Sequence, residues 1–144
     1  MVQYILQTSE SSDYEFLKNV HHQTLKEHVF KIWGWNELEQ DKFFSDDFET
    51  GQLQLIKFLG KPVGYLQLNQ SPSEIYIVNV LILPEFQNQG LGSQIINDLI
   101  LKAKNAGQSL KLGVFKVNTR AKNLYVSLGF KTYEETETHY LMRL

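Results

Sequence analysis

The stretch that most constrains the fold runs from Leu81 to Ser93 and reads LILPEFQNQGLGS. An apolar strand passes through a proline into a turn that carries Gly90 and Gly92, and a helical pattern follows at once. Glycines at a helix start let the backbone approach a ligand and expose N–H groups that have no partner inside the helix. Because the peptide dipoles add about half a positive charge there, the turn is typical of an anion-binding site for a phosphate or pyrophosphate.

The glycine pair by itself is also explained by tight packing of a helix start against the preceding strand, and for two glycines alone that explanation is favoured. No Gly-Lys-Ser/Thr follows, which excludes a nucleotide P-loop. The third glycine of a dinucleotide-binding fingerprint is also absent. A second motif is therefore needed before a ligand can be argued.

That second motif lies between Asn118 and Phe130 and reads NTRAKNLYVSLGF. Gln-x-x-Gly-x-Gly after a strand and a proline, followed by Asn-x-x-Ala-x-x-Leu-Tyr-x-x-x-Gly-Phe, resembles the acetyl-CoA-binding core of the GNAT N-acetyltransferases. The resemblance covers nearly the whole chain in element order. It is specific at the level of motifs from about Ile75 to Phe130.

The 144 residues fit one domain, residues 1–144, which is long enough to bury a core without disulfides or a metal. The absence of cysteine excludes a disulfide framework and a cysteine nucleophile. A formal charge of −2, with both signs interspersed, gives no case for nucleic acid or an anionic membrane as partner. The first residues lack a basic segment followed by a long apolar run, so we expect a cytoplasmic protein without a signal peptide or membrane span.

Hydrophobic periodicity, turn residues and capping residues predict eleven elements. Their order is β-α-α-β-β-β-α-β-α-β-β, which predicts an α/β (α+β) fold. The resemblance implies a mixed, mostly antiparallel sheet of six to seven strands with helices on both faces. The predicted strands are 2–7, 52–59, 63–68, 74–83, 110–117, 130–134 and 138–144, with a hairpin turn at Gly60-Lys61; the helices are 14–32, 37–48 capped by Asn36, 91–106 ended by Gly107, and 119–128 ended by Gly129.

The strand 74–83 is apolar on both faces, so we expect it to be central and covered by helices on both sides. Asn79 interrupts it. Because asparagine is disfavoured inside strands, Asn79 marks the place where we expect a bulge that frees a backbone group for a ligand.

Two histidines, His21 and His28, fall on the apolar face of the first helix. They are two turns apart, about 10.5 Å, which is too far to share a metal ion. We therefore predict satisfied core or pocket-rim histidines and no metal site.

Trp33 and Trp35 lie on the connection between the first two helices. An indole there suits either the lining of an acceptor pocket or the closing of the core, and the residues alone favour neither. The resemblance implies that this connection faces the acceptor substrate, which favours the pocket.

The resemblance implies acetyl-CoA as the acyl donor. Its pyrophosphate would lie on the N–H groups of 87–93, and its pantetheine arm would add as a pseudo-strand beside the strand holding Ile82, where a backbone N–H would polarise the thioester carbonyl. Asn118 would serve as a helix N-cap, a pantetheine contact or both. The expected cofactor-binding residues are Leu81, Ile82, Leu83, Gln87, Asn88, Gln89, Gly90, Leu91, Gly92, Ser93, Asn118, Ala121 and Tyr125.

Transfer to an amine poses two proton problems, since the amine must lose a proton and the leaving thiolate must gain one. The resemblance assigns the general acid to Tyr125; spacing alone would make it a packing residue on the apolar helix face. Glu74 could act as base through water, although a solvated carboxylate at a strand start is the plainer explanation. Asn79 could bind the acceptor or orient a water, and Tyr76 would join it, Trp33 and Trp35 in binding substrate.

The predicted function is transfer of an acetyl group from acetyl-CoA to a primary amine of a small molecule or peptide, by direct attack. The main alternative is a non-catalytic module that binds or senses acyl-CoA. A nucleotide-binding domain is disfavoured because the glycine spacing fails. A homodimer formed through the C-terminal strands is a further hypothesis.

Overall fold

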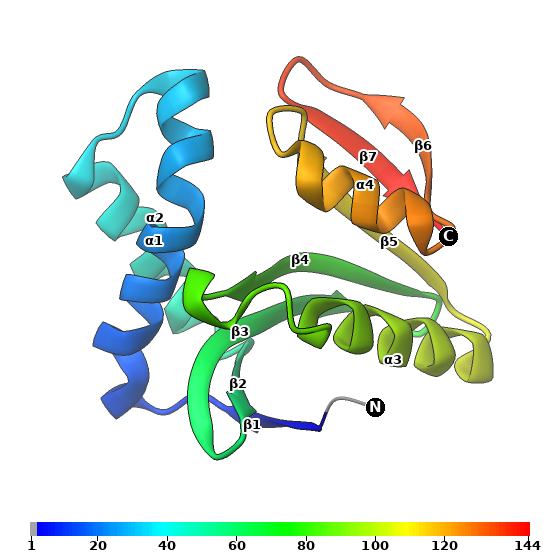
Figure 1. Cartoon of the computed structure of the whole chain (residues 1–144), viewed down its shortest axis with the longest axis horizontal. Coiled ribbons are helices and arrows are strands. Elements are labelled where there is room, and N and C mark those ends of the chain that lie inside the picture. The colour runs from blue at the N-terminus through cyan, green and yellow to red at the C-terminus, as the bar shows by residue number, and fades with distance from the viewer. Residues whose placement is uncertain (1–2) are drawn as a thin grey trace. The chain divides into compact units, whose positions relative to one another are not determined.

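A computed structural model describes residues 3–144 of the chain (Figure 1). Its helices and strands follow the predicted order, and two short 3-10 turns are added at Ser11–Asp13 and Pro84–Phe86. The strands are β1 Tyr4–Thr8, β2 Leu53–Phe58, β3 Lys61–Gln70, β4 Glu74–Ile82, β5 Ser109–Phe115, β6 Lys131–Glu135 and β7 His139–Arg143; the helices are α1 Tyr14–Trp33, α2 Glu37–Glu49, α3 Leu91–Ala106 and α4 Thr119–Ser127.

The seven strands form one sheet in the order β1-β2-β3-β4-β5-β7-β6. β4 and β5 run parallel, while β1 with β2, β2 with β3, β5 with β7 and β6 with β7 are antiparallel. The mixed, mostly antiparallel sheet confirms the predicted fold class. β1 is an edge strand as predicted, although Val2 of the predicted strand lies outside the described residues.

The chain divides into two compact units, one formed by residues up to Gln67 together with Asn79–Leu91, the other by Leu68–Val78 with Gly92–Leu144. In the first unit, α1 and α2 lie side by side (Figure 1) and pack on β2 and β3. Its core consists of Leu17, Val20, Phe44, Leu53, Leu55, Tyr65 and Leu83. In the second unit, α3 buries the stripe that its 3.6-residue period predicts, including Ile95, Ile96, Leu99 and Ala103.

The hairpin between β2 and β3 is present, but its two-residue turn is Leu59-Gly60 and not Gly60-Lys61 as predicted. Lys61 already pairs with Phe58. Both turn residues have positive φ, 53° at Leu59 and 78° at Gly60. A two-residue hairpin that matches the strand twist needs this conformation at both positions, so glycine takes one and leucine accepts the strain at the other.

β4 is only partly covered. Ile75 and Ile77 on one face of its first half are buried, but Tyr76 and Val78 on the other face are half-buried, as are Val80, Leu81 and Ile82 in the second half. The prediction of two covered faces is therefore wrong, because only one face of the first half is buried. Gly64 on β3 lies against this second half: a Cβ there would stand 1.9 Å from the carbonyl oxygen of Leu81. The main chain of β4 thus comes closer to β3 at Leu81 than any side chain at position 64 would allow.

Within residues 3–144, no helix is both long and apolar enough to cross a membrane.

Candidate functional site

The glycine turn follows the end of β4 through the 3-10 turn Pro84–Phe86. Asn88 and Gly90 both have positive φ, 64° and 81°, and α3 begins at Leu91. The Gln87 side chain donates to the Ile82 carbonyl at 2.8 Å and so ties the turn to the strand end. Left-handed backbone at two residues just before the start of a 16-residue helix is typical of a turn that presents N–H groups to an anion, such as the expected pyrophosphate.

In the second unit, Asn118 caps α4. Its side-chain oxygen accepts a hydrogen bond from the backbone N–H of Ala121 at 3.1 Å. The N-cap role, one of the two left open by the sequence, is confirmed. The cap fixes where α4 begins, two turns before Tyr125.

Tyr125 is buried, with 8% of its surface exposed, and its ring meets Phe130 edge-on at 5.9 Å between centroids. Burial raises the pKa of the phenol to about 12. Across residues 3–144 its hydroxyl makes no side-chain hydrogen bond. Tyr125 is therefore both a packing residue, as spacing predicts, and a protonated hydroxyl available to a ligand.

Glu74, the predicted base, lies at the start of β4 and forms an ion pair with Lys111 of β5 at 2.9 Å. The ion pair raises the pKa of the Lys111 ammonium. Tyr76, two residues on, pairs with Lys111 in the sheet register. Burial, and then Tyr133 and Glu74, raise the pKa of its phenol, whose hydroxyl lies 3.0 Å from where a Cβ on Gly113 would be.

The two tryptophans differ in surroundings. Trp33 is 62% exposed, so it does not close the core. Trp35 meets the His22 ring edge-on at 5.1 Å, donates its indole N–H to Glu37 at 2.5 Å and lies under the Lys26 ammonium at 5.5 Å. Trp35 is thus part of a polar cluster that the sequence analysis did not identify.

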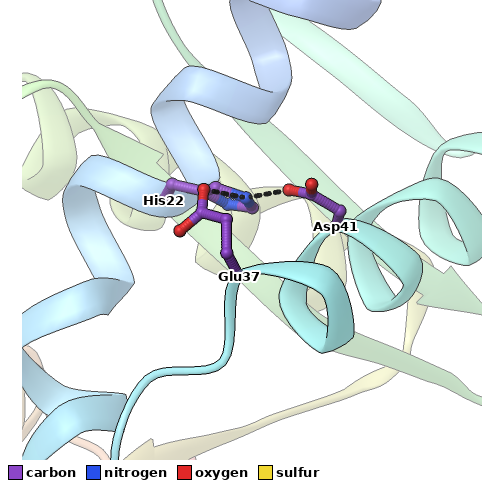
Figure 2. A group of neighbouring side chains, drawn as sticks. All are labelled: His22, Glu37 and Asp41. Atoms are coloured by element: carbon purple, nitrogen blue, oxygen red, sulfur yellow. Dashed lines mark hydrogen bonds and ion pairs between the residues drawn. The ribbon is translucent and has the colours of Figure 1, made fainter.

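That cluster joins α1 to α2 (Figure 2). Figure 2 shows His22 from α1 pointing toward Glu37 and Asp41 from α2. His22 Nε2 lies 2.6 Å from the Asp41 Oδ1 and 3.8 Å from the Glu37 Oε1. The three ligand atoms lie within 4.8 Å of one another, which a metal ion could use, but Nε2 is already at hydrogen-bond distance from Asp41. We assign the cluster as a polar link between the two helices; the i, i+4 spacing of the carboxylates was its only sequence signal.

His21 supports the same link from the core side. It is buried, and its Nδ1 lies 2.9 Å from the Nδ1 of His22. Burial, and then the neighbouring His22, lower the pKa of His21 to about 4. The prediction of a satisfied core histidine is confirmed for His21.

A second polar group connects α2, β3 and β4. Asn79 Nδ2 donates to the Gln67 Oε1 at 3.1 Å, and the Gln67 amide lies beside the Asp47 carboxylate, whose pKa it lowers. Gln67 is only 3% exposed. Burial raises the pKa of Asp47, and the bond from Gln67 offsets part of that rise. Asn79 was predicted from the sequence as a site residue, whereas its two partners were not.

Tyr65 lies on the same face of β3 as Gln67, two residues away. It is fully buried, and its hydroxyl has no hydrogen-bond partner within the described part of the chain. Burial and the charge of Asp47 raise the pKa of this phenol. A buried hydroxyl without a partner is uncommon in folded proteins and weakens the packing that surrounds it.

Comparisons with known proteins agree with the two motifs. The model of the acetyltransferase (GNAT) family matches residues 13–130. Thialysine N-epsilon-acetyltransferase of Bos taurus is 37% identical over 70 residues, which make up 48% of this chain and 41% of that protein. The chain therefore spans less than half the length of this curated relative.

Two solved structures resemble the fold over almost the whole chain. PaiA N-acetyltransferase from Thermoplasma acidophilum, in complex with coenzyme A, has a TM-score of 0.77 at 14% identity and covers 98% of both chains. The ribosomal-protein-S18-alanine N-acetyltransferase of Escherichia coli has a TM-score of 0.68 at 22% identity, over 99% of this chain and 93% of that one. Since the family model covers most of its length, the protein belongs to the acetyltransferase (GNAT) family.

Proposed function

We propose that this protein transfers an acetyl group from acetyl-CoA to a primary amine by direct attack. The observation that carries the proposal is Tyr125, a buried, protonated phenol without a side-chain hydrogen bond, at the tyrosine of the second motif. The left-handed turn at Asn88 and Gly90 before α3 supports acetyl-CoA as donor, because it fits a pyrophosphate. The coenzyme A bound by the Thermoplasma relative supports the same donor.

In the proposed reaction the amine nitrogen attacks the thioester carbonyl carbon, the C–N bond forms, the C–S bond breaks and the amine loses a proton. Tyr125 faces the sulfur as hydrogen-bond donor and acid. With a pKa of about 12 it is a weaker acid than a thiol, whose pKa is about 8.5. We therefore infer that its hydrogen bond first stabilises the developing charge on sulfur, and that proton transfer completes as the leaving thiolate is confined in the same dry surroundings.

Glu74 is the proposed general base. Glu74 is engaged by Lys111 at 2.9 Å, and a nearby cation makes a carboxylate a weaker base. We therefore expect Glu74→Gln to reduce kcat less than Tyr125→Phe does. Should Glu74→Gln reduce kcat more, Glu74 and not Tyr125 would be the principal proton-transfer residue.

Both a small amine and a peptide N-terminus remain acceptor classes under this proposal. The Bos taurus relative is named for thialysine, a small amine, and the Escherichia coli protein for the alanine of a ribosomal protein. Trp35 and Tyr76, each partly buried, would supply apolar surface for either. We further propose a cytoplasmic location, from the sequence pattern, and a homodimer through β6, whose residues are all exposed at the sheet edge.

The test is thiol release from acetyl-CoA against a panel of amines, polyamines, amino acids and short peptides, with wild type and Tyr125→Phe. We expect acceptor-dependent release that falls at least about tenfold in kcat for the variant, about 1.4 kcal/mol of transition-state stabilisation. Tyr133→Phe is the matched control, because Tyr133 is exposed on β6. Binding of acetyl-CoA without release for any acceptor would favour the non-catalytic module, and absence of binding would contradict the proposal.

A further inference from the structure

The hydrogen-bonded series Asp47–Gln67–Asn79 has a fixed direction. The Gln67 carbonyl oxygen is engaged by Asn79, so the NH₂ group of Gln67 is the end that remains for the neighbouring Asp47 carboxylate, which only accepts when it is ionised. The Gln67 carbonyl oxygen then faces Asn79 and accepts from the Asn79 NH₂ at 3.1 Å. The charge of Asp47 on α2 thereby favours the orientation in which the Asn79 NH₂ group is bonded and the Asn79 carbonyl oxygen is not.

The end left over is an acceptor. Across the described residues, Asn79 makes the one side-chain hydrogen bond to Gln67, through nitrogen. Its Oδ1 is therefore still able to accept. Asn79 is half-buried, and it precedes the half-buried apolar residues Val80, Leu81 and Ile82, so it belongs to the part of β4 that is not fully covered.

We propose that Asn79 Oδ1 binds the acceptor amine by accepting one of its N–H groups, and that Gln67 and Asp47 are positioning residues that hold this oxygen outward. The proposal rests on the proposed function. A neutral primary amine has two N–H donors and one lone pair, so giving one N–H to Asn79 leaves the lone pair free to attack. The opposite amide orientation would present an NH₂ donor, which the amine lone pair would bind and thereby lose its nucleophilicity.

The structure also indicates why the orientation is stable. Gln67 is almost fully buried, so an inverted amide would face the Asp47 carboxylate with its own oxygen and leave two acceptors together in a dry site. Asp47 is itself partly buried, which strengthens the constraint. Burial, which raises the pKa of Asp47, and the bond from Gln67, which lowers it, are consistent with a carboxylate held in this position.

The first test replaces Asn79. Steady-state kinetics with the best amine of the panel should give a KM for the amine that rises about tenfold in Asn79→Leu, the effect of one lost hydrogen bond, with the KM for acetyl-CoA unchanged. An amine KM within about twofold of wild type overturns the proposal, whereas a wild type that acetylates no amine overturns the proposed function itself.

The second test disrupts and then restores the direction of the series. Gln67→Glu places a carboxylate against Asp47, and the repulsion between the two should displace the group that accepts from Asn79 and raise the amine KM about tenfold. The double variant Asp47→Asn with Gln67→Glu exchanges the two groups. The amide introduced on α2 then donates to the carboxylate introduced on β3, which again accepts from Asn79, so the KM should return to within about threefold of wild type. Asp46→Asn, an exposed charge removal beside Asp47, is the matched control and should leave the KM unchanged.

The same proteins are also unfolded in urea. A positioning series requires that Gln67→Glu lower the urea midpoint and that the double variant recover it, even if no amine is a substrate. A double variant no better than Gln67→Glu in both KM and midpoint would overturn the assigned direction. Recovery of the midpoint without recovery of KM would limit Asp47 and Gln67 to a structural role and overturn the positioning claim.

Discussion

Two aspartates on α2, six positions apart, have opposite electrostatic surroundings. The pKa of Asp41 is lowered, first by its hydrogen bond with His22, and the pKa of Asp47 is raised, first by burial. Asp41 belongs to a group whose members bind one another, with His22 and Trp35 both engaged. Asp47 instead lies beside the Gln67 amide, whose oxygen accepts a hydrogen bond from Asn79.

The two aspartates show two structural roles for a carboxylate: Asp41 links two helices, and Asp47 orients a neighbouring amide. On the Asp41 side, His22 bonds Asp41 and the Trp35 indole bonds Glu37, so the result is a link between α1 and α2. On the Asp47 side, the Gln67 oxygen accepts from the Asn79 NH₂ group, which leaves the Asn79 carbonyl oxygen on β4 able to accept. The second arrangement leaves an acceptor on β4 for a substrate.

Phe44 separates the two sides, and its removal has the largest expected effect. It is fully buried, and its ring lies 5.5 Å from His21 and 6.3 Å from Tyr65. Phe44→Ala should lower the free energy of unfolding by about 3–5 kcal/mol, measured in urea, because it leaves a cavity in the first core. Phe43→Ala, at a half-exposed neighbour, should cost less than about 1 kcal/mol. Equal losses would contradict the core position of Phe44.

Protonation of His21 should destabilise the fold at low pH. The pKa of His21 falls from 6.5 to about 4 on folding, so the unfolded chain binds the proton more readily. The stabilisation of the fold by neutral His21, about 3 kcal/mol in all, is fully present above pH 6.5 and is lost as the pH falls toward 4. We expect thermal unfolding temperatures that drop between pH 6.5 and 4.5 in wild type and drop less in His21→Leu. Parallel pH curves for the two proteins would show that His21 is not responsible.

Near Asp47, the buried Tyr65 hydroxyl should cost the fold free energy. This hydroxyl has no partner among residues 3–144, so Tyr65→Phe removes a group that costs free energy and keeps the ring packed on Phe44. The free energy of unfolding should rise by about 1 kcal/mol. Tyr14→Phe is the contrasting change, because the Tyr14 hydroxyl bonds Ser45, and it should destabilise. A loss in Tyr65→Phe would indicate a bound water on the hydroxyl.

The smallest expected effect is a difference in sign between Asp41→Asn and Asp47→Asn. The ionised Asp41 stabilises the fold above the unfolded pKa of 3.8, and this is lost as the pH falls through its lower folded value. The ionised Asp47 is disfavoured by burial, so its neutral form stabilises the fold below 3.8, and this is lost as the pH rises through its higher folded value. Relative to wild type, Asp41→Asn should lose and Asp47→Asn should gain stability as the pH rises from about 3 to about 6. Urea midpoints at several pH values across this range measure both slopes, and slopes of the same sign would contradict the comparison.

Most of the fold was predictable because it depends on local signals. The caps at Asn36 and Asn118 act within one helical turn, and both are confirmed. The hairpin turn was misplaced by one residue because Gly60 was assigned to the first turn position, whereas the observed turn places it second and takes Leu59 as the first. Helix and strand periods cannot resolve a shift of one residue in a turn.

The site was predictable where the motifs are contiguous and not where it depends on pairing across elements. Tyr125 and the turn before α3 follow from their motifs, and their roles in the reaction stay predictions. Gln67 and Asp47 were not identified, because nothing in an alternating strand or an acidic helix indicates that one glutamine will be buried against one aspartate. The half-burial of β4 was also missed, since its apolar sequence is equally typical of a strand covered throughout.

The absence of a side chain at Gly64 also has a consequence for how the protein can vary. A methyl group at this position would collide with a main-chain carbonyl and not with a side chain that could rotate away. The displaced carbonyl belongs to Leu81, which lies between Asn79 and the turn, so one added carbon atom on β3 would move the strand that carries the proposed amine contact. Position 64 therefore constrains the geometry of the proposed amine contact without being part of it, and screening for activity alone would misread Gly64→Ala as the loss of a catalytic residue.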